Sequence, residues 1–207
     1  WDESYHSLFG AIQEAQQKKK KKGLSLFENE SVSILEIGFG TGLNAFITFL
    51  EYPKLNQKIN YVGVEGYPVT IEEAGLMNYV AELNAENEKN VFDLLHQCKW
   101  EEGIELNKDF LFTKRNQFFA DIKDKEKYDL IYFDAFGYDV QPELWSIEIF
   151  KIMFESLKNK GVLVTYAARG VIKRNMIEAG FTVEKLEGAP GKREMFRANK
   201  GRNLSVK

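Results

Sequence analysis

A glycine-rich turn directly after an apolar run is the feature that most limits what this chain can fold into. The stretch LEIGFGTGLN places Gly38, Gly40 and Gly42 at every second position. Val32–Ile37, before the turn, reads as a buried strand, and Leu43–Tyr52, after it, reads as a helix. Glycine lets the backbone turn tightly or approach a ligand closely. We therefore expect a strand–turn–helix unit with a ligand site at the carboxyl end of the strand.

Strand and helix patterns alternate along the rest of the chain, which implies a parallel sheet covered on both faces. The last two strands follow each other directly, so we expect them to form an antiparallel hairpin at one edge. The sequence thus predicts one α/β domain over residues 1–207, with a mostly parallel, seven-stranded sheet. The further strands are expected at residues 59–65, 110–114, 128–134, 162–167, 181–186 and 194–197, and the further helices at 68–83, 91–98, from 144 to an end at Lys160-Gly161, and 171–179.

Composition excludes several classes of protein. The 207 residues are 44% hydrophobic and 29% charged, which is ordinary for a globular protein. Cys98 is the single cysteine, so no intramolecular disulfide can form, and with only two histidines we expect no metal site. No apolar run reaches membrane-spanning length, and the one after Lys18–Lys22 is too short for a signal peptide. We expect a soluble, cytoplasmic protein.

Charge is distributed unevenly. The net charge of −3 argues against indiscriminate binding to nucleic acid. Residues 169–207, however, hold ten Lys and Arg against four Asp and Glu, a local surplus of +6. This surplus fits either a patch that binds a polyanion or scattered charge that keeps the protein in solution.

The glycine pattern itself disfavours a pyrophosphate ligand. Leu43 stands where the dinucleotide-binding fingerprint has its third glycine, and the Gly-Lys-Ser/Thr of a phosphate loop is absent. Asn44 is suited to cap the helix that follows. Taken alone, the glycines could also form a plain tight turn.

Two acidic residues beside the turn favour an adenosyl cofactor. Glu36 lies inside an apolar strand, where a carboxylate needs a partner such as a methionyl ammonium. Glu65 ends the second expected strand, where a carboxylate can accept both hydroxyls of a ribose. The combination predicts S-adenosyl-L-methionine as the cofactor. The residues expected to hold it are Glu36, Gly38, Gly40, Gly42, Asn44 and Glu65, together with Asp134.

Asp134 is the candidate catalytic residue. It ends the fourth expected strand in the stretch YFDAF and would emerge on the same edge of the sheet, beside the methyl group of the cofactor. In that place its carboxylate would accept a hydrogen bond from a substrate amine and aim the nitrogen lone pair. The alternative is a helix cap or a turn residue.

Several motifs together resemble one family. GFGTGLN, YFDAF, QPELW, GVLVTYAARG, NMIEAGFTVE and PGKREM look like the methyltransferase domain of the tRNA 5-methylaminomethyl-2-thiouridine biosynthesis bifunctional protein family and its stand-alone relatives. The resemblance runs along nearly the whole chain, and DAF followed by PELW and GKREM is not shared with methyltransferases generally. It implies a Rossmann-like fold and methylation of the 5-aminomethyl group of a wobble uridine in tRNA. The flavin-dependent oxidase domain of the larger family members is not expected in this chain.

The resemblance also suggests substrate contacts. Phe136, Trp145 and Tyr166 are candidates to stack on the uracil, with core packing as the alternative for each. Lys192 and Arg193 are candidates to contact phosphates or to frame the pocket.

Three departures from the family pattern bear on function. Phe118 stands where we expect an acid that holds the adenine amino group, and Asp121 follows three residues later. Lys18–Lys22 replaces an apolar segment, so we expect a solvated or disordered strip there within an N-terminal extension, residues 1–30. Gly137-Tyr138 replaces a more usual residue-Pro pair, which would loosen the loop over the substrate.

Two other functions remain open on the sequence alone. One is a small-molecule N-methyltransferase or an aminopropyltransferase on the same fold. The other is a non-catalytic RNA-binding module that has kept the fold without turnover.

Overall fold

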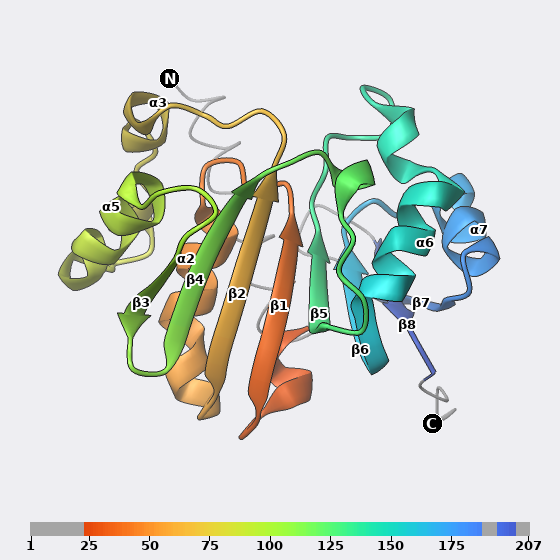
Figure 1. The fold of residues 1–207 in the computed structure, drawn as a ribbon, viewed down its shortest axis with the longest axis horizontal. Coiled ribbons are helices and arrows are strands. Elements are labelled where there is room, and N and C mark those ends of the chain that lie inside the picture. The colour runs from red at the N-terminus through yellow and green to blue at the C-terminus, as the bar shows by residue number, and fades with distance from the viewer. Residues whose placement is uncertain (1–22, 188–193, 202–207) are drawn as a thin grey trace.

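An eight-stranded sheet forms the scaffold of the protein (Figure 1). The structure is a computed structural model that describes residues 23–187 and 194–201. The strand order is β3-β4-β2-β1-β5-β6-β8-β7, and the five strands from β4 to β6 are all parallel. The strands are β1 (Ser31–Ile37), β2 (Lys58–Glu65), β3 (Gly103–Asn107), β4 (Phe110–Asn116), β5 (Tyr128–Phe133), β6 (Leu157–Thr165), β7 (Thr182–Glu187) and β8 (Glu194–Asn199).

The two edges of the sheet are antiparallel. β8 lies between β6 and β7 and pairs antiparallel with both, which confirms the predicted C-terminal hairpin. β3 pairs antiparallel with β4 at the other edge and was not predicted, so the expected count of seven strands is wrong. Its sequence, GIELN, is too short and too polar to show the apolar pattern of a strand, and none of its residues is buried.

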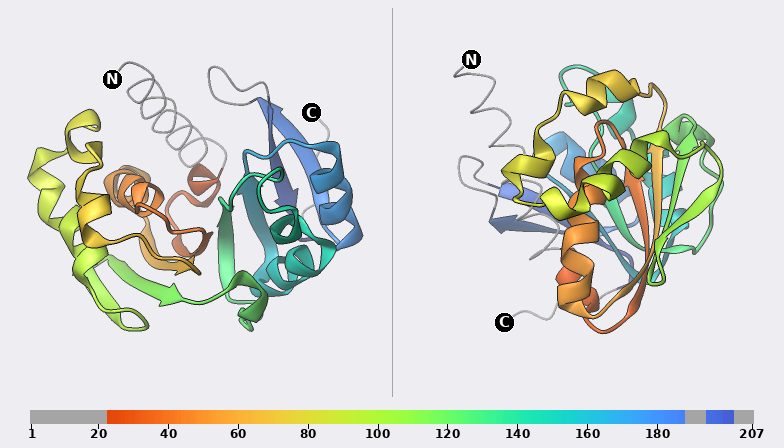
Figure 2. Two further views of the ribbon diagram at one scale, coloured as in Figure 1. Left: turned by 90° about the horizontal axis from the view of Figure 1, so that it is seen from above. Right: turned by 90° about the vertical axis from the view of Figure 1, so that its left-hand side faces the viewer.

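Helices cover both faces of the sheet (Figure 2). Alternate residues of β1 point to opposite faces, so Ile34 packs with α2 (Leu43–Glu51) and α5 (Lys89–Gln97), whereas Leu35 packs with α6 (Ile147–Ser156) and α7 (Gly170–Glu178). Each face therefore has its own hydrophobic cluster. This two-sided burial explains why the central strands read as continuous apolar runs.

The predicted helix over residues 68–83 is wrong. Two short helices, α3 (Ile71–Gly75) and α4 (Tyr79–Glu82), occupy this segment. Thr70 starts α3 through a capping box, because its hydroxyl accepts from the Glu73 backbone N–H at 3.1 Å and the Glu73 carboxylate accepts from the Thr70 N–H at 2.8 Å. The helix start expected at Pro68 overlooks this cap.

The predicted helix from residue 144 to Lys160-Gly161 also has different ends. Residues Pro142–Trp145 form a separate 3-10 turn, and Ser146 caps α6 by accepting from the Ile149 N–H. At the other end, the hydroxyl of Ser156 donates to Ile152 O at 2.8 Å and α6 stops there. Lys160 and Gly161 lie inside β6 instead of ending a helix.

The described part of the N-terminal segment packs on the core. Leu24 and Phe27 are buried, and the side-chain amide of Gln57 donates to both of their carbonyls at 2.9 Å. The lysine run Lys18–Lys22 lies outside the described residues. Within the described part of the chain, every helix is too short or too polar to cross a membrane.

Gly42, at the start of α2, lies directly against His96 of α5. Its φ angle is +75°, and a Cβ added there would meet His96 Nε2 at 2.9 Å. The imidazole also packs edge-on against Phe92, with ring centroids 5.0 Å apart. Burial, together with the positive charge of Lys114, lowers the pKa of His96 to about 4. The imidazole is therefore neutral at neutral pH and serves as a packing group.

This packing predicts a pH-dependent stability. The pKa of His96 is about 4 in the folded chain and about 6.5 in an unfolded one, so the unfolded state binds more protons between these values. The free energy of unfolding should be fully retained above about pH 6.5 and should fall as the pH drops toward about 4. Urea unfolding at about pH 7 and about pH 5 measures this loss. The loss should be smaller in His96→Phe than in wild type; equal losses in the two proteins would contradict the prediction.

Candidate cofactor and substrate site

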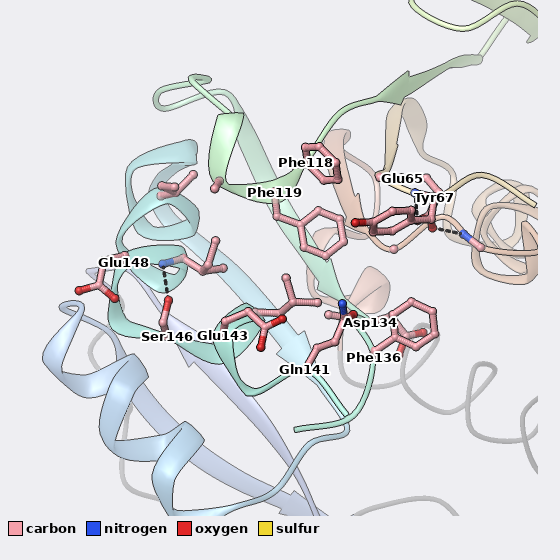
Figure 3. A pocket seen from close by; sticks show the side chains of 18 residues that line it. Glu65, Tyr67, Phe118, Phe119, Asp134, Phe136, Gln141, Glu143, Ser146 and Glu148 are labelled. Carbon is pink, nitrogen blue, oxygen red and sulfur yellow. Dashed lines mark hydrogen bonds between the residues drawn. The ribbon is translucent and has the colours of Figure 1, made fainter. Parts of the chain in front are cut away.

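A cavity of about 550 Å³ lies at the carboxyl ends of β1, β2, β4 and β5 (Figure 3). In a parallel sheet this edge is the usual place for a ligand. The residues after each of these strands contribute to its wall, and the start of α6 closes the remaining side. The lining residues are Gly38, Gly40, Glu65, Gly66, Tyr67, Phe118, Phe119, Ala120, Asp134, Ala135, Phe136, Gln141, Glu143, Leu144, Ser146, Glu148, Ile149 and Ile152.

The carboxylate of Glu65 is fixed by the backbone around it. Oε2 accepts from the Gly40 N–H at 2.9 Å, and Oε1 accepts from the Tyr67 N–H at 3.0 Å. The side chain is only 7% exposed and lines the cavity. Because each carboxylate oxygen has two lone pairs, one site on each oxygen is still available to a pair of hydroxyl groups.

Asp134 meets the glycine turn at the end of β5. Its backbone N–H donates to Ile37 O at 2.9 Å, and its own carbonyl oxygen would lie 2.7 Å from a Cβ on Gly38. Only glycine fits at position 38, where φ is +86°. The Asp134 side chain is exposed and lines the cavity.

Asn44 holds the carboxylate of Asp134. Its Nδ2 donates to Asp134 Oδ2 at 2.9 Å, and the asparagine is itself buried in the first turn of α2. From the sequence we expected Asn44 to cap its helix and to contact the cofactor. No side chain caps α2, and the described contact of the Asn44 amide is with Asp134.

Three of the predicted cofactor residues, Glu36, Gly42 and Asn44, lie outside the lining of the cavity. Glu36 is fully buried on the face of the sheet covered by α2, and its Oε2 accepts from the Tyr61 hydroxyl at 2.8 Å. Burial, together with the Glu36 carboxylate, raises the pKa of Tyr61 well above its ordinary value. Gly42 faces His96, as described above, whereas Gly38 and Gly40 do line the cavity.

Of the three aromatic side chains predicted to stack on the uracil, one lines the cavity and two are buried in the core. Phe136 is 60% exposed and lines the cavity. Trp145 is 2% exposed and packs on Phe133, with ring centroids 5.0 Å apart. Tyr166 is 9% exposed and belongs to the core on the α2 face. Lys192 and Arg193 lie outside the described residues.

Trp145 nevertheless supports the mouth of the cavity. Its indole Nε1 donates to Phe136 O at 2.8 Å, and its own carbonyl accepts from Asn175 Nδ2 of α7 at 2.8 Å. The loop after Phe136 also contacts Arg169, which precedes α7. The guanidinium of Arg169 binds both carboxylate oxygens of Asp139 and lies 5.6 Å from the ring centroid of Tyr138. The loop with Gly137-Tyr138 is thus held against the start of α7 in this structure.

The apolar wall of the cavity was not predicted from the sequence. Tyr67 and Phe118 meet edge-on with centroids 5.6 Å apart, and Phe119 and Ile149 continue the wall. Phe118 therefore lines the position where we expected an acid, and Asp121 is not among the lining residues. The only signal for this wall in the sequence is that Tyr67 and Phe118 each follow a strand by two residues.

A family model described as S-adenosyl-L-methionine-dependent methyltransferase matches residues 81–201. Two curated relatives share the name tRNA 5-methylaminomethyl-2-thiouridine biosynthesis bifunctional protein MnmC. The one from Campylobacter fetus subsp. fetus is 31% identical over 178 residues, which is 81% of this chain and 28% of the relative. The one from Paraburkholderia phymatum is 26% identical over 212 residues, 95% of this chain and 32% of the relative. The chain thus spans about a third of the length of these relatives.

Solved structures show the same fold at low sequence identity. MNMC2 from Aquifex aeolicus superposes with a TM-score of 0.73 at 19% identity, covering 95% of this chain and 63% of that chain. Spermidine synthase from Thermotoga maritima superposes with a TM-score of 0.55 at 17% identity, covering 92% of this chain and 61% of that chain. The family model covers more than half of the sequence. This chain therefore belongs to the S-adenosyl-L-methionine-dependent methyltransferases and is related to the methyltransferase domain of the MnmC proteins.

Proposed function

We propose that this chain methylates the 5-aminomethyl group of a wobble uridine in tRNA, using S-adenosyl-L-methionine. The single observation that carries the proposal is that Gly38, Glu65 and Asp134 line one cavity at the carboxyl edge of the sheet. The name of the curated relatives supplies the substrate class, because it refers to a methylaminomethyl-uridine of tRNA.

The residues of the cavity fit this cofactor. A volume of about 550 Å³ lies within the usual range for small-molecule sites. The two open positions on the Glu65 carboxylate match the two hydroxyls of a ribose, and Gly40 leaves bare backbone beside them. The apolar wall of Phe118, Phe119 and Ile149 suits a purine ring. When bound, S-adenosyl-L-methionine supplies an electrophilic methyl group on a positively charged sulfur.

Asp134 would bind and orient the substrate amine. An alkylamine has a pKa near 10, so most of it is protonated at neutral pH, and the enzyme must bind or generate the neutral form. The Asp134 carboxylate would accept an N–H bond and orient the nitrogen, and it would pass the released proton to water. It is not a strong base, since an ordinary aspartate is far too acidic. The bond from Asn44 fixes the orientation of the Asp134 carboxylate, which would hold it in a defined position relative to the amine.

The exposed ring of Phe136 is the described group best placed to stack on the uracil. Its 60% exposure at the mouth of the cavity fits a base that is splayed out of an RNA loop. Arg169, at the start of α7, contacts Tyr138 and Asp139 of the loop that carries Phe136, and Lys173 and Arg174 follow it in the same helix. Lys192 and Arg193 stay predictions for phosphate contacts.

The proposal is tested with methyl-labelled cofactor and tRNA that carries the unmethylated 5-aminomethyl group. Label should enter the tRNA, and digestion should place it on the wobble nucleoside. Fully modified tRNA is the control and should stay unlabelled. Label that appears only in an added small amine would instead identify a small-molecule methyltransferase, and bound cofactor with no label in tRNA or amine would contradict the proposed methyl transfer.

Replacement of the carboxylate should separate catalysis from cofactor binding. Asp134→Asn should lower the transfer rate by at least about 100-fold, because the amine loses its charged acceptor. Asn44→Ala should lower the rate by about tenfold to hundredfold, since it frees the carboxylate to rotate. Single-turnover kinetics measure the transfer rate of each variant, and equilibrium binding measures its affinity for the cofactor. Asp121→Asn, at an exposed position outside the cavity, is the matched control. Equal losses of rate and cofactor affinity in Asp134→Asn would contradict its substrate role.

Replacement of Gly40 should mainly weaken cofactor binding, whereas replacement of Gly42 should mainly lower the stability of the fold. Both Gly40 and Gly42 have positive φ, so alanine costs about 1 kcal/mol or more of strain at either position. A Cβ on Gly40 meets nothing within 4 Å and projects into open space, whereas one on Gly42 collides with His96. We expect Gly40→Ala to weaken cofactor binding at least about tenfold and Gly42→Ala to lose more stability. Calorimetric binding and urea unfolding of both variants decide this; the reverse ranking would remove Gly40 from the cofactor site.

A further inference from the structure

A second cavity, of about 310 Å³, lies on the other side of the glycine turn. Gly40 lines both cavities, but the remaining walls differ. The second cavity is bounded by residues 68–71, which lead into α3, by the end of α5 and by β4. Among the described residues that line it, Lys114 is the sole cation, and none is an aspartate or a glutamate.

Lys114 carries a buried charge. Its residue is 3% exposed, and burial lowers the pKa of its ammonium. Nζ donates to His96 O at 2.5 Å, at the C-terminal end of α5, and lies 4.7 Å from the ring centroid of Trp100. A helix C-terminus and an aromatic face both favour a cation, but neither carries a full negative charge. No carboxylate of the described residues lies within the 4.0 Å of an ion pair.

Three further side chains that carry hydrogen-bond donors line the same cavity as Lys114. An ammonium has three N–H groups, and one carbonyl satisfies only one of them. Trp100 and Gln97 line the same cavity, and within the described part of the chain neither side chain has a hydrogen-bond partner. Thr70 also lines it; its hydroxyl accepts from the Glu73 N–H, and its proton remains available. The cavity therefore offers one positive charge and several donors to a ligand.

We propose that this second cavity binds an oxyanion of the phosphate class on Lys114. Burying an unpaired charge is costly, and a bound anion would remove that cost. A phosphate group presents acceptor oxygens in several directions, which suits donors that come from three separate segments, whereas a carboxylate presents two. The phosphate could be free in solution or part of an RNA backbone. This inference does not rest on the proposed methyltransferase substrate, because the two cavities share only Gly40.

The indole N–H signals of the full chain provide the test. The three tryptophans are Trp1, Trp100 and Trp145, so the ¹H–¹⁵N spectrum has few indole peaks to assign. Inorganic phosphate is added at neutral pH, with potassium chloride of equal ionic strength as the reference. The Trp100 peak should shift saturably, with a Kd of about 1 mM or tighter, and the peak of buried Trp145 should stay fixed as the reporter of an intact fold.

Matched lysine variants connect the shift to the buried charge. Lys114→Met should weaken phosphate binding at least about tenfold. Lys99→Met is the control, because Lys99 is exposed and pairs with Glu102 at 3.4 Å; it should bind as wild type does. A short oligoribonucleotide at equal phosphate concentration forms a second arm. A Lys114-dependent shift with this RNA alone would identify a backbone phosphate as the occupant.

Two results would overturn the proposal. The first is a Trp100 peak of the wild-type protein that shifts no more with phosphate or RNA than with chloride. This result needs no variant, so it holds even if Lys114→Met fails to fold. The other is an equal, saturable shift in wild type and in a folded Lys114→Met.

Discussion

The close approach of the β1 turn to the end of β5 is the constraint on which the rest of the site depends. Asp134 is held to Ile37 by a backbone hydrogen bond of 2.9 Å, and Gly38 has no room for a side chain beside the Asp134 carbonyl. Because these two strand ends are in contact, the first turn of α2 reaches the Asp134 carboxylate through Asn44. The same turn then directs the Gly40 N–H to Glu65 at the end of β2. Three strands are thus tied together at the cavity, by backbone hydrogen bonds from the end of β1 to the ends of β5 and β2 and by the side chains of Asn44 and Glu65.

Much of this arrangement follows from the sequence. Buried parallel strands are continuous apolar runs, so their ends can be located, and residues that follow those ends must share one edge of the sheet. The order of apolar runs and polar residues therefore suffices to place Glu65 and Asp134 beside the glycines. Their precise partners do not follow in this way, because the bond from Asn44 to Asp134 joins residues that are 90 positions apart.

The failures have physical causes of their own. Glu36 and Ile34 share the face of β1 that packs under α2, while the residues of the cavity's apolar wall belong to the opposite face, so a carboxylate two positions before the turn points away from the cavity. Trp145 ends a 3-10 turn that begins with the exposed residues Pro142 and Glu143, but its indole turns inward onto Phe133 and Phe150. β3 escapes recognition because an edge strand needs few apolar residues. For Glu36 and Trp145, the direction of the side chain decides the outcome.

The indole of Trp145 couples the entrance of the cavity to a helix at the periphery. Asn175 of α7 anchors the tryptophan backbone, and the tryptophan ring in turn anchors the backbone of Phe136. A displacement of α7 at Asn175 would therefore move the backbone of Trp145 and, through its indole, the carbonyl group of Phe136 at the mouth of the cavity.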